Sequence, residues 1–234
     1  MSQFWEACPF HKIVGYFNKA VQQRTYVVFF FTDSSNGTVV GLDEIILRTT
    51  NGGATWNQQY SWDRGEFSGV FFTDVNNGTV VGSGILHTTN GGTDWINQTS
   101  GTTGSFTGVY FTDANKGWAV GDSGRIIHTT NSGLSWVSQA TSTTNLLYGI
   151  AFADSNNGIV VGTDGIILTT TNGGKSWVHQ ISITTNTLWS VSMVDIDIAT
   201  AVGTAGTILR TINGGVNWSS QTSGILAALT SVSF

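Results

Sequence analysis

Five tryptophans recur along this chain at nearly constant spacing. The intervals are 39, 41, 41 and 41 residues, and the tryptophans are Trp56, Trp95, Trp136, Trp177 and Trp218. Each one ends the same phrase, Thr-x-Asn-x-Gly-x-x-Trp, which begins at Thr49, Thr88, Thr129, Thr170 and Thr211. A fixed period of about 40 residues is typical of repeat architectures, in which each unit buries its apolar surface against its neighbours. No other property of the sequence limits the fold as strongly.

One repeat divides into four short strands. In the third repeat we expect these at residues 106–111, 118–121, 125–129 and 135–139, separated by turns rich in Asp, Asn, Ser and Gly. Four antiparallel strands per unit of about 40 residues are the pattern of a β-propeller blade. The sequence therefore predicts an all-β fold, a β-propeller of four-stranded antiparallel blades. A solenoid of β-hairpins is the competing architecture.

The two ends of the chain break the repeat. Residues 229–234 copy the first strand of a unit, whereas residues 1–25 lack the tryptophan motif but would supply further strands at 11–15 and 20–24. We expect six blades with both termini sharing one, since a closed ring removes exposed sheet edges. Five blades, or a fragment of seven, are the alternatives. The predicted units of this single domain, 1–234, are 1–25 as a partial blade, 26–66, 67–105, 106–146, 147–187 and 188–228 as repeats, and 229–234 as an orphan inner strand.

Composition excludes several classes of function. A net charge of −5 and a pI near 5.1 argue against an electrostatic grip on nucleic acid. The only cysteine, Cys8, permits no internal disulfide framework and has no partners spaced for a metal site. No apolar run reaches the roughly 18 residues that a membrane span requires. We therefore expect no cofactor, no metal, no nucleic acid and no membrane span.

The recurring motif resembles the Asp-box of sialidase-type propellers, with Asn in place of Asp. A short Asn side chain can cap a tight turn, Gly can take the left-handed conformation, and Trp can pack on the neighbouring sheet. The motif thus predicts a structural role. Across residues 26–234, the fuller phrase is similar to the photosystem II stability/assembly factor family, best at residues 116–121, Lys-Gly-Trp-Ala-Val-Gly.

This resemblance implies a non-enzymatic scaffold that lies outside the cytoplasm and binds partner proteins. The first residues, Met-Ser-Gln-Phe-Trp-Glu, lack the order of a secretory leader. The location is therefore an expectation from the resemblance alone. The resemblance also implies a cluster of arginines, whereas the five arginines here are spread along the sequence, at Arg24, Arg48, Arg64, Arg125 and Arg210.

An enzyme is the less favoured interpretation. Sialidase chemistry needs three arginines on the substrate carboxylate, a tyrosine nucleophile with a Glu partner, and an acid. The chain has only three glutamates, Glu6, Glu44 and Glu66, and nothing marks a pair of acids in one cleft. The sequence therefore predicts no enzyme.

The loop that joins the first repeat to the second is the candidate partner site. It combines aromatic and charged residues, the types enriched at interface hot spots, in Tyr60, Trp62, Asp63, Arg64 and Glu66. Tyr148 and Trp189, at the starts of inner strands, would line the same face near the axis. The alternative is that Trp62 folds back onto a neighbouring blade.

A second candidate is a partial basic band at equivalent positions of four repeats, Arg48, His87, His128 and Arg210. Such a band would bind an anion or a partner; alternatively, these side chains are polar strand ends that cover a hydrophobic edge. The leading hypothesis is a protein-binding scaffold, which we expect to be monomeric if the ring of blades closes. The alternatives are a glycan-binding surface module, with Tyr60 and Trp62 as sugar platforms, and a sialidase-like hydrolase.

Overall fold

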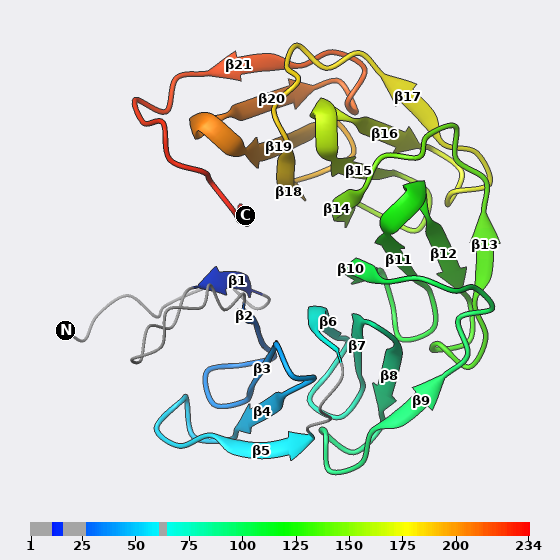
Figure 1. Cartoon of the computed structure of the whole chain (residues 1–234), viewed down its shortest axis with the longest axis vertical. Coiled ribbons are helices and arrows are strands. Elements are labelled where there is room, and N and C mark those ends of the chain that lie inside the picture. Colours follow the sequence, from blue (N-terminus) through cyan, green and yellow to red (C-terminus); the bar gives the residue numbers. More distant parts are fainter. Residues whose placement is uncertain (1–10, 16–26, 61–64) are drawn as a thin grey trace.

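The computed structural model describes residues 11–15, 27–60 and 65–234, which form five antiparallel sheets around a common axis (Figure 1). No α-helix occurs within these ranges. The prediction of an all-β propeller fold is confirmed. None of the described residues forms a helix that is long and apolar enough to span a membrane.

The sheets follow one another in chain order, and within each sheet the strands pair in sequence order. The first sheet has five strands, β1 (His11–Gly15), β2 (Val27–Phe31), β3 (Gly37–Gly41), β4 (Ile46–Thr49) and β5 (Asn57–Tyr60). The second and third hold β6 (Phe67–Phe72), β7 (Gly78–Gly82), β8 (Ile85–Thr88), β9 (Ile96–Gln98), β10 (Phe106–Phe111), β11 (Gly117–Gly121), β12 (Ile126–Thr129) and β13 (Val137–Gln139). The fourth and fifth hold β14 (Leu147–Phe152), β15 (Gly158–Gly162), β16 (Ile167–Thr170), β17 (Val178–Gln180), β18 (Leu188–Met193), β19 (Ile198–Gly203), β20 (Ile208–Ile212) and β21 (Ser219–Gln221).

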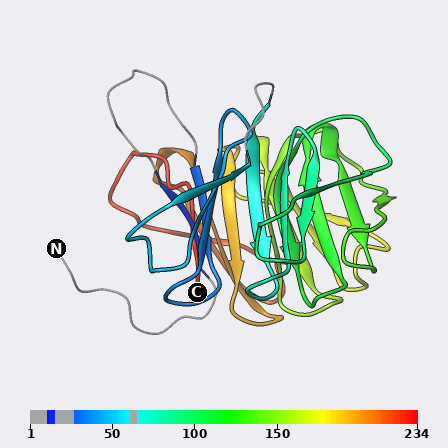
Figure 2. The same cartoon turned by 90° about the horizontal axis from the view of Figure 1, so that it is seen from below.

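The strands run between two opposite faces of the ring, on which the turns gather (Figure 2). One face carries the turns that follow the inner strands β2, β6, β10, β14 and β18, together with the tryptophan motifs; we call it the motif face. The other carries the loops between sheets and the short 3-10 turns η1 (Asp122–Gly124), η2 (Thr163–Gly165) and η3 (Thr204–Gly206); we call it the loop face.

Apolar residues fill the spaces between successive sheets. One cluster joins Trp118 and Ile126 of the third sheet to Phe152 and Trp177 of the fourth, and an equivalent cluster joins the fourth to the fifth. The middle strands β7, β11 and β15 are buried along their whole length because neighbouring sheets cover both faces. This explains why these strands consist of glycine and apolar residues rather than alternating, apart from Thr79 in β7.

The recurring motif forms the turn between the third and fourth strands of each sheet. In the fourth sheet, the Thr170 hydroxyl accepts the Gly174 N–H at 2.8 Å, and the Asn172 side-chain oxygen accepts the Ser176 N–H at 3.0 Å. Trp177 then meets the ring of Phe152 edge-on, with centroids 6.1 Å apart. The motif side chains are thus used within the fold, as the structural interpretation predicts.

Inner strands are crowded near the axis. A Cβ on Gly108 of β10 would lie 2.7 Å from the main-chain oxygen of Tyr148 on β14, so only glycine fits there.

The ends of the chain differ from the prediction of a shared sixth blade. β1 pairs antiparallel with β2, with Ile13 opposite Phe29, so residues 11–15 extend the first sheet. Residues 229–234 form no strand, although the Leu229 N–H donates to the Gly203 oxygen at 2.9 Å. Within the described residues, the five sheets form an arc (Figure 1). Residues 11–15 therefore belong to the first sheet and not to a blade shared with residues 229–234, while the number of blades stays a prediction. Residues 20–24 lie outside the described ranges.

Candidate functional site

Two aromatic side chains from neighbouring inner strands meet at the loop face. Tyr148 is the second residue of β14 and Trp189 the second residue of β18, and their ring centroids lie 4.3 Å apart at an interplanar angle of 48°. Both side chains are half-buried. The indole N–H of Trp189 is shielded from solvent and has no hydrogen-bond acceptor among the described residues. The structure therefore brings these two predicted residues together.

The described members of the predicted loop, Tyr60 and Glu66, lie in another part of the molecule, where the first and second sheets meet. Tyr60 ends β5, with its ring 6.2 Å from that of Phe67, and burial raises its pKa, with a further contribution from Glu44. Glu66 is exposed, and its N–H donates to the Ser83 hydroxyl at 3.0 Å. Trp62, Asp63 and Arg64 lie outside the described residues.

Arg48, the first member of the predicted basic band, lies between sheets. It is buried, and one guanidinium nitrogen donates to the main-chain oxygen of Val75 in the second sheet at 3.0 Å. The guanidinium carbon also lies 5.7 Å from the centre of the Phe72 ring. Burial lowers the Arg48 pKa, with the charge of Asp33 opposing. These contacts join the first sheet to the second.

The remaining members of the basic band are also buried or half-buried within the fold. His87 is buried 3.1 Å from the Thr79 hydroxyl, and the ring of His128 stacks on Trp118 with centroids 4.6 Å apart. Burial lowers the pKa of both imidazoles, which favours their neutral forms. Arg210 on β20 is half-buried. The contacts of these four residues favour the alternative interpretation, in which polar side chains at strand ends cover apolar surface. That the band binds an anion or a partner stays a prediction.

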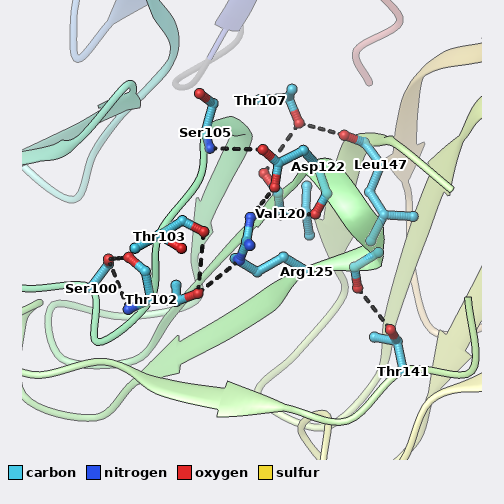
Figure 3. Close-up of polar contacts among 11 residues, drawn as sticks. Ser100, Thr102, Thr103, Ser105, Thr107, Val120, Asp122, Arg125, Thr141 and Leu147 are labelled. Atoms are coloured by element: carbon cyan, nitrogen blue, oxygen red, sulfur yellow. Dashed lines mark hydrogen bonds and ion pairs between the residues drawn. The ribbon is translucent and has the colours of Figure 1, made fainter. Parts of the chain in front are cut away.

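A polar cluster on the loop face fixes the connection into the third sheet (Figure 3). Arg125 pairs with the Asp122 carboxylate and donates through Nε to the Thr102 hydroxyl at 3.0 Å. The other Asp122 oxygen accepts the Ser105 N–H at 3.1 Å. The cluster ties the incoming loop to the η1 turn, so it holds loop-face backbone in place.

An axial cavity of about 670 Å³ opens among the inner strands and the turns that follow them, toward the motif face. Its lining includes one residue from the same repeat position of each sheet. These are aromatic in the first three sheets and small in the last two: Phe30, Phe71, Tyr110, Ala151 and Ser192. The sequence analysis missed this cavity. Aligning the repeats at the residue three places before each turn aspartate would have exposed this asymmetry.

No group of three or more His, Cys, Asp or Glu side chains in the described ranges is placed to hold a metal ion. The turn aspartates form hydrogen bonds within their own turns. Asp154, for example, accepts the N–H groups of Asn156 and Asn157 at 2.7 and 2.9 Å. These bonds and the Asn157 side chain lower its pKa. Such aspartates stabilise turns.

The sequence matches a family model described as photosynthesis system II assembly factor YCF48, over residues 17–100 and 135–223. The chain belongs to this family. Since the matched segments cover more than half of the 234 residues, the resemblance seen in the repeat phrase is confirmed. No curated protein matches the chain.

Solved structures similar to this YCF48-family chain share its fold at low sequence identity. YCF48 bound to D1 peptide is 20% identical with a TM-score of 0.68, covering 94% of this chain and 72% of that one. A GH74 enzyme of Niastella koreensis is 14% identical with a TM-score of 0.66, covering 82% of this chain and 37% of that one. U3-55K is 10% identical with a TM-score of 0.72, covering 87% and 68%. At these identities the likeness shows the fold alone.

Proposed function

We propose that this YCF48-family chain is a non-catalytic scaffold that binds a protein partner at the loop face, with Tyr148 and Trp189 in the contact. Family membership and the structural likeness to a YCF48–peptide complex support a polypeptide partner. The observation that carries the choice of site is the contact between these two aromatic rings.

Aromatic side chains on a rigid surface are suited to protein recognition. Tyr and Trp offer large contact area with few rotatable bonds, and they are enriched among interface hot spots. An indole N–H that is shielded from water and lacks an acceptor is unfavourable by about 1–3 kcal/mol. A partner carbonyl that accepts from Trp189 would remove this cost. The hydrogen bond to the partner and the burial of the two aromatic rings would then stabilise the same contact.

The loop that contains Tyr60, Trp62, Asp63, Arg64 and Glu66 is a further part of the proposed contact surface. Its described members, Tyr60 at the end of β5 and Glu66 just before β6, lie at the loop face, as the aromatic pair does. We also propose that the scaffold is located outside the cytoplasm, as the family resemblance implies, and that it is monomeric if the ring of blades closes.

The test is capture of partners from the native source by the wild-type chain and by Tyr148→Ala and Trp189→Ala. Val137→Ala is the control, since Val137 is 67% exposed on the outer strand β13. We expect one set of proteins to be recovered by the wild type and the control and lost with both aromatic variants. Recovery that is unchanged in Trp189→Ala would contradict the proposed site. Sugars retained on a glycan array, or turnover of an aryl sialoside, would contradict the proposed class of function.

A further inference from the structure

We infer that the axial cavity on the motif face is a second interaction site, which takes a large apolar side chain from a basic segment of a partner protein. The inference rests on the proposed function in one respect, that the partner is a polypeptide. It concerns the opposite face of the ring from Tyr148 and Trp189.

The shape of the cavity favours an apolar side chain. On one side, Phe71 lies between Phe30 and Tyr110, with ring centroids 5.1 Å from each. On the other side, Ala151 and Ser192 occupy the equivalent positions, and residues 232–234 near the C-terminus also contribute to the lining. Substituting small residues for aromatic ones on only part of a ring leaves space beside an aromatic wall. The volume of about 670 Å³ falls within the range of about 300–1,000 Å³ that is usual for binding sites. It therefore accommodates a side chain together with the backbone that carries it.

The walls also offer groups that recognise a main chain. The inner strands β10, β14 and β18 each stand first in their sheets, so one edge of each is unpaired in the described sheets. An extended peptide can bind such an edge through main-chain hydrogen bonds. The chain itself uses this mode once, where β1 pairs along the inner edge of β2. In addition, the Thr112 hydroxyl at the cavity is shielded from solvent and has no partner among the described residues.

The negative charge around the opening of the cavity favours a partner segment that carries positive charge. Among the side chains that the structure describes, the cavity lining includes the carboxylates of Asp113 and Asp154 and no Lys, Arg or His. Lys116, in the same turn as Asp113, is exposed and is not part of the lining. Equivalent turns of the other sheets add acids to this face at Asp33, Asp74 and Asp195. A face of this sign attracts cationic partners and repels anionic ones.

The test uses three synthetic peptides and the full chain. Their sequences are Gly-Lys-Phe-Lys-Gly, Gly-Glu-Phe-Glu-Gly and Gly-Lys-Ala-Lys-Gly, and dissociation constants are measured by NMR titration. We expect the first peptide to bind at least about tenfold more tightly than either of the others, since it alone carries both the apolar side chain and the positive charge. Equal binding of the three peptides, or no binding of the first, would overturn the inference.

Two variants locate the binding. Ser192→Phe fills the cavity from its small side and should abolish binding of the first peptide, with thermal unfolding as the check on folding. Asp113→Asn keeps a side-chain oxygen for the N–H groups of Asn115 and Lys116, and should weaken binding by about threefold because exposed charge pairs contribute little. The control is Asp164→Asn, which removes one charge from the loop face. Binding that is unchanged in Ser192→Phe or in Asp113→Asn would contradict the assignment.

The two proposals fail separately. If Trp189→Ala loses its captured partners while the first peptide does not bind, only the axial site is wrong. If the peptide binds as expected while capture is unchanged in Trp189→Ala, only the loop-face site is wrong.

Discussion

The Tyr110 hydroxyl donates a hydrogen bond of 2.9 Å to the main-chain oxygen of Phe152. This bond crosses from the inner strand of the third sheet to that of the fourth. The equivalent residue of the second sheet, Phe71, has no hydroxyl with which to make it. Tyr110 therefore forms part of the aromatic wall of the axial cavity and also joins two sheets.

Removing the Tyr110 hydroxyl should weaken the contact between the third and fourth sheets. Tyr110→Phe leaves the ring in place but leaves the Phe152 oxygen without its donor, so we expect the free energy of unfolding to fall by about 1 kcal/mol. Urea unfolding measures the change, with the exposed substitution Val137→Ala as the control. A variant as stable as the wild type would show that water replaces the bond at no cost.

Trp118 is the largest fully buried side chain between the third and fourth sheets. Its ring stacks on Phe152 with centroids 3.9 Å apart, and its indole N–H donates to the Gly173 oxygen at 3.2 Å. We expect Trp118→Ala to lower the free energy of unfolding by about 3–5 kcal/mol, and Trp118→Phe to cost less, since it leaves a smaller cavity. Denaturant unfolding of the two variants tests this order. A smaller loss for Ala than for Phe would contradict the described packing.

The motif turns offer a matched pair of substitutions at Asn172. Asn172→Ala removes the oxygen that accepts the Thr170 hydroxyl and the Ser176 N–H, whereas Asn172→Asp retains an oxygen in that place. We expect a loss of about 1–2 kcal/mol for Ala, as for other lost side-chain caps, and less for Asp. Thermal unfolding of both variants checks this. Equal losses would mean that the side-chain oxygen does not hold the turn.

Acidification should destabilise the fold through its buried histidines. The pKa of His87 is lowered by burial from its ordinary value of 6.5. As the pH falls below about 6.5, the unfolded chain binds a proton that the folded chain does not, so the free energy of unfolding decreases; above that pH the contribution is fully present. His128 acts in the same direction, because burial and the nearby charge of Lys116 lower its pKa.

Unfolding midpoints between about pH 7.5 and about pH 5 isolate this effect, because carboxyl groups titrate mainly below about pH 4.5. In His87→Gln the amide can still bond with Thr79 but cannot gain the proton, so the dependence on pH should become shallower. Stability that rises on acidification, or a slope that is unchanged in this variant, would contradict the burial of a neutral imidazole.

The sequence predicted those parts of the fold that depend on local chemistry. The recurring motif marks a turn because each of its residue types suits one position there, as Thr170, Asn172, Gly174 and Trp177 show. The recurrence of the motif then predicts where the strands before and after each turn lie. The place of residues 11–15 was predicted wrongly for a physical reason. Residues 11–15 are compatible with any unpaired strand edge, and spacing alone does not show that the edge of β2 takes them.

The candidate site was predictable only in part. The contact between Tyr148 and Trp189 follows from their equivalent places in successive repeats. The basic band was proposed from the same periodicity, yet that periodicity does not show that Arg48 lies between two sheets. The axial cavity depends on the change from Tyr110 to the small residues Ala151 and Ser192 at equivalent positions, which becomes meaningful once the fold places these inner-strand residues around one axis.

Site-specific photo-cross-linking tests most directly the central claim, that the loop face binds a protein. A photoreactive phenylalanine analogue replaces Trp189 in one variant and Val137 in another, and both are irradiated in extract of the native source. We predict one polypeptide cross-linked through position 189 and absent at position 137. Equal products at both positions, or no cross-linked polypeptide at position 189, would contradict the account.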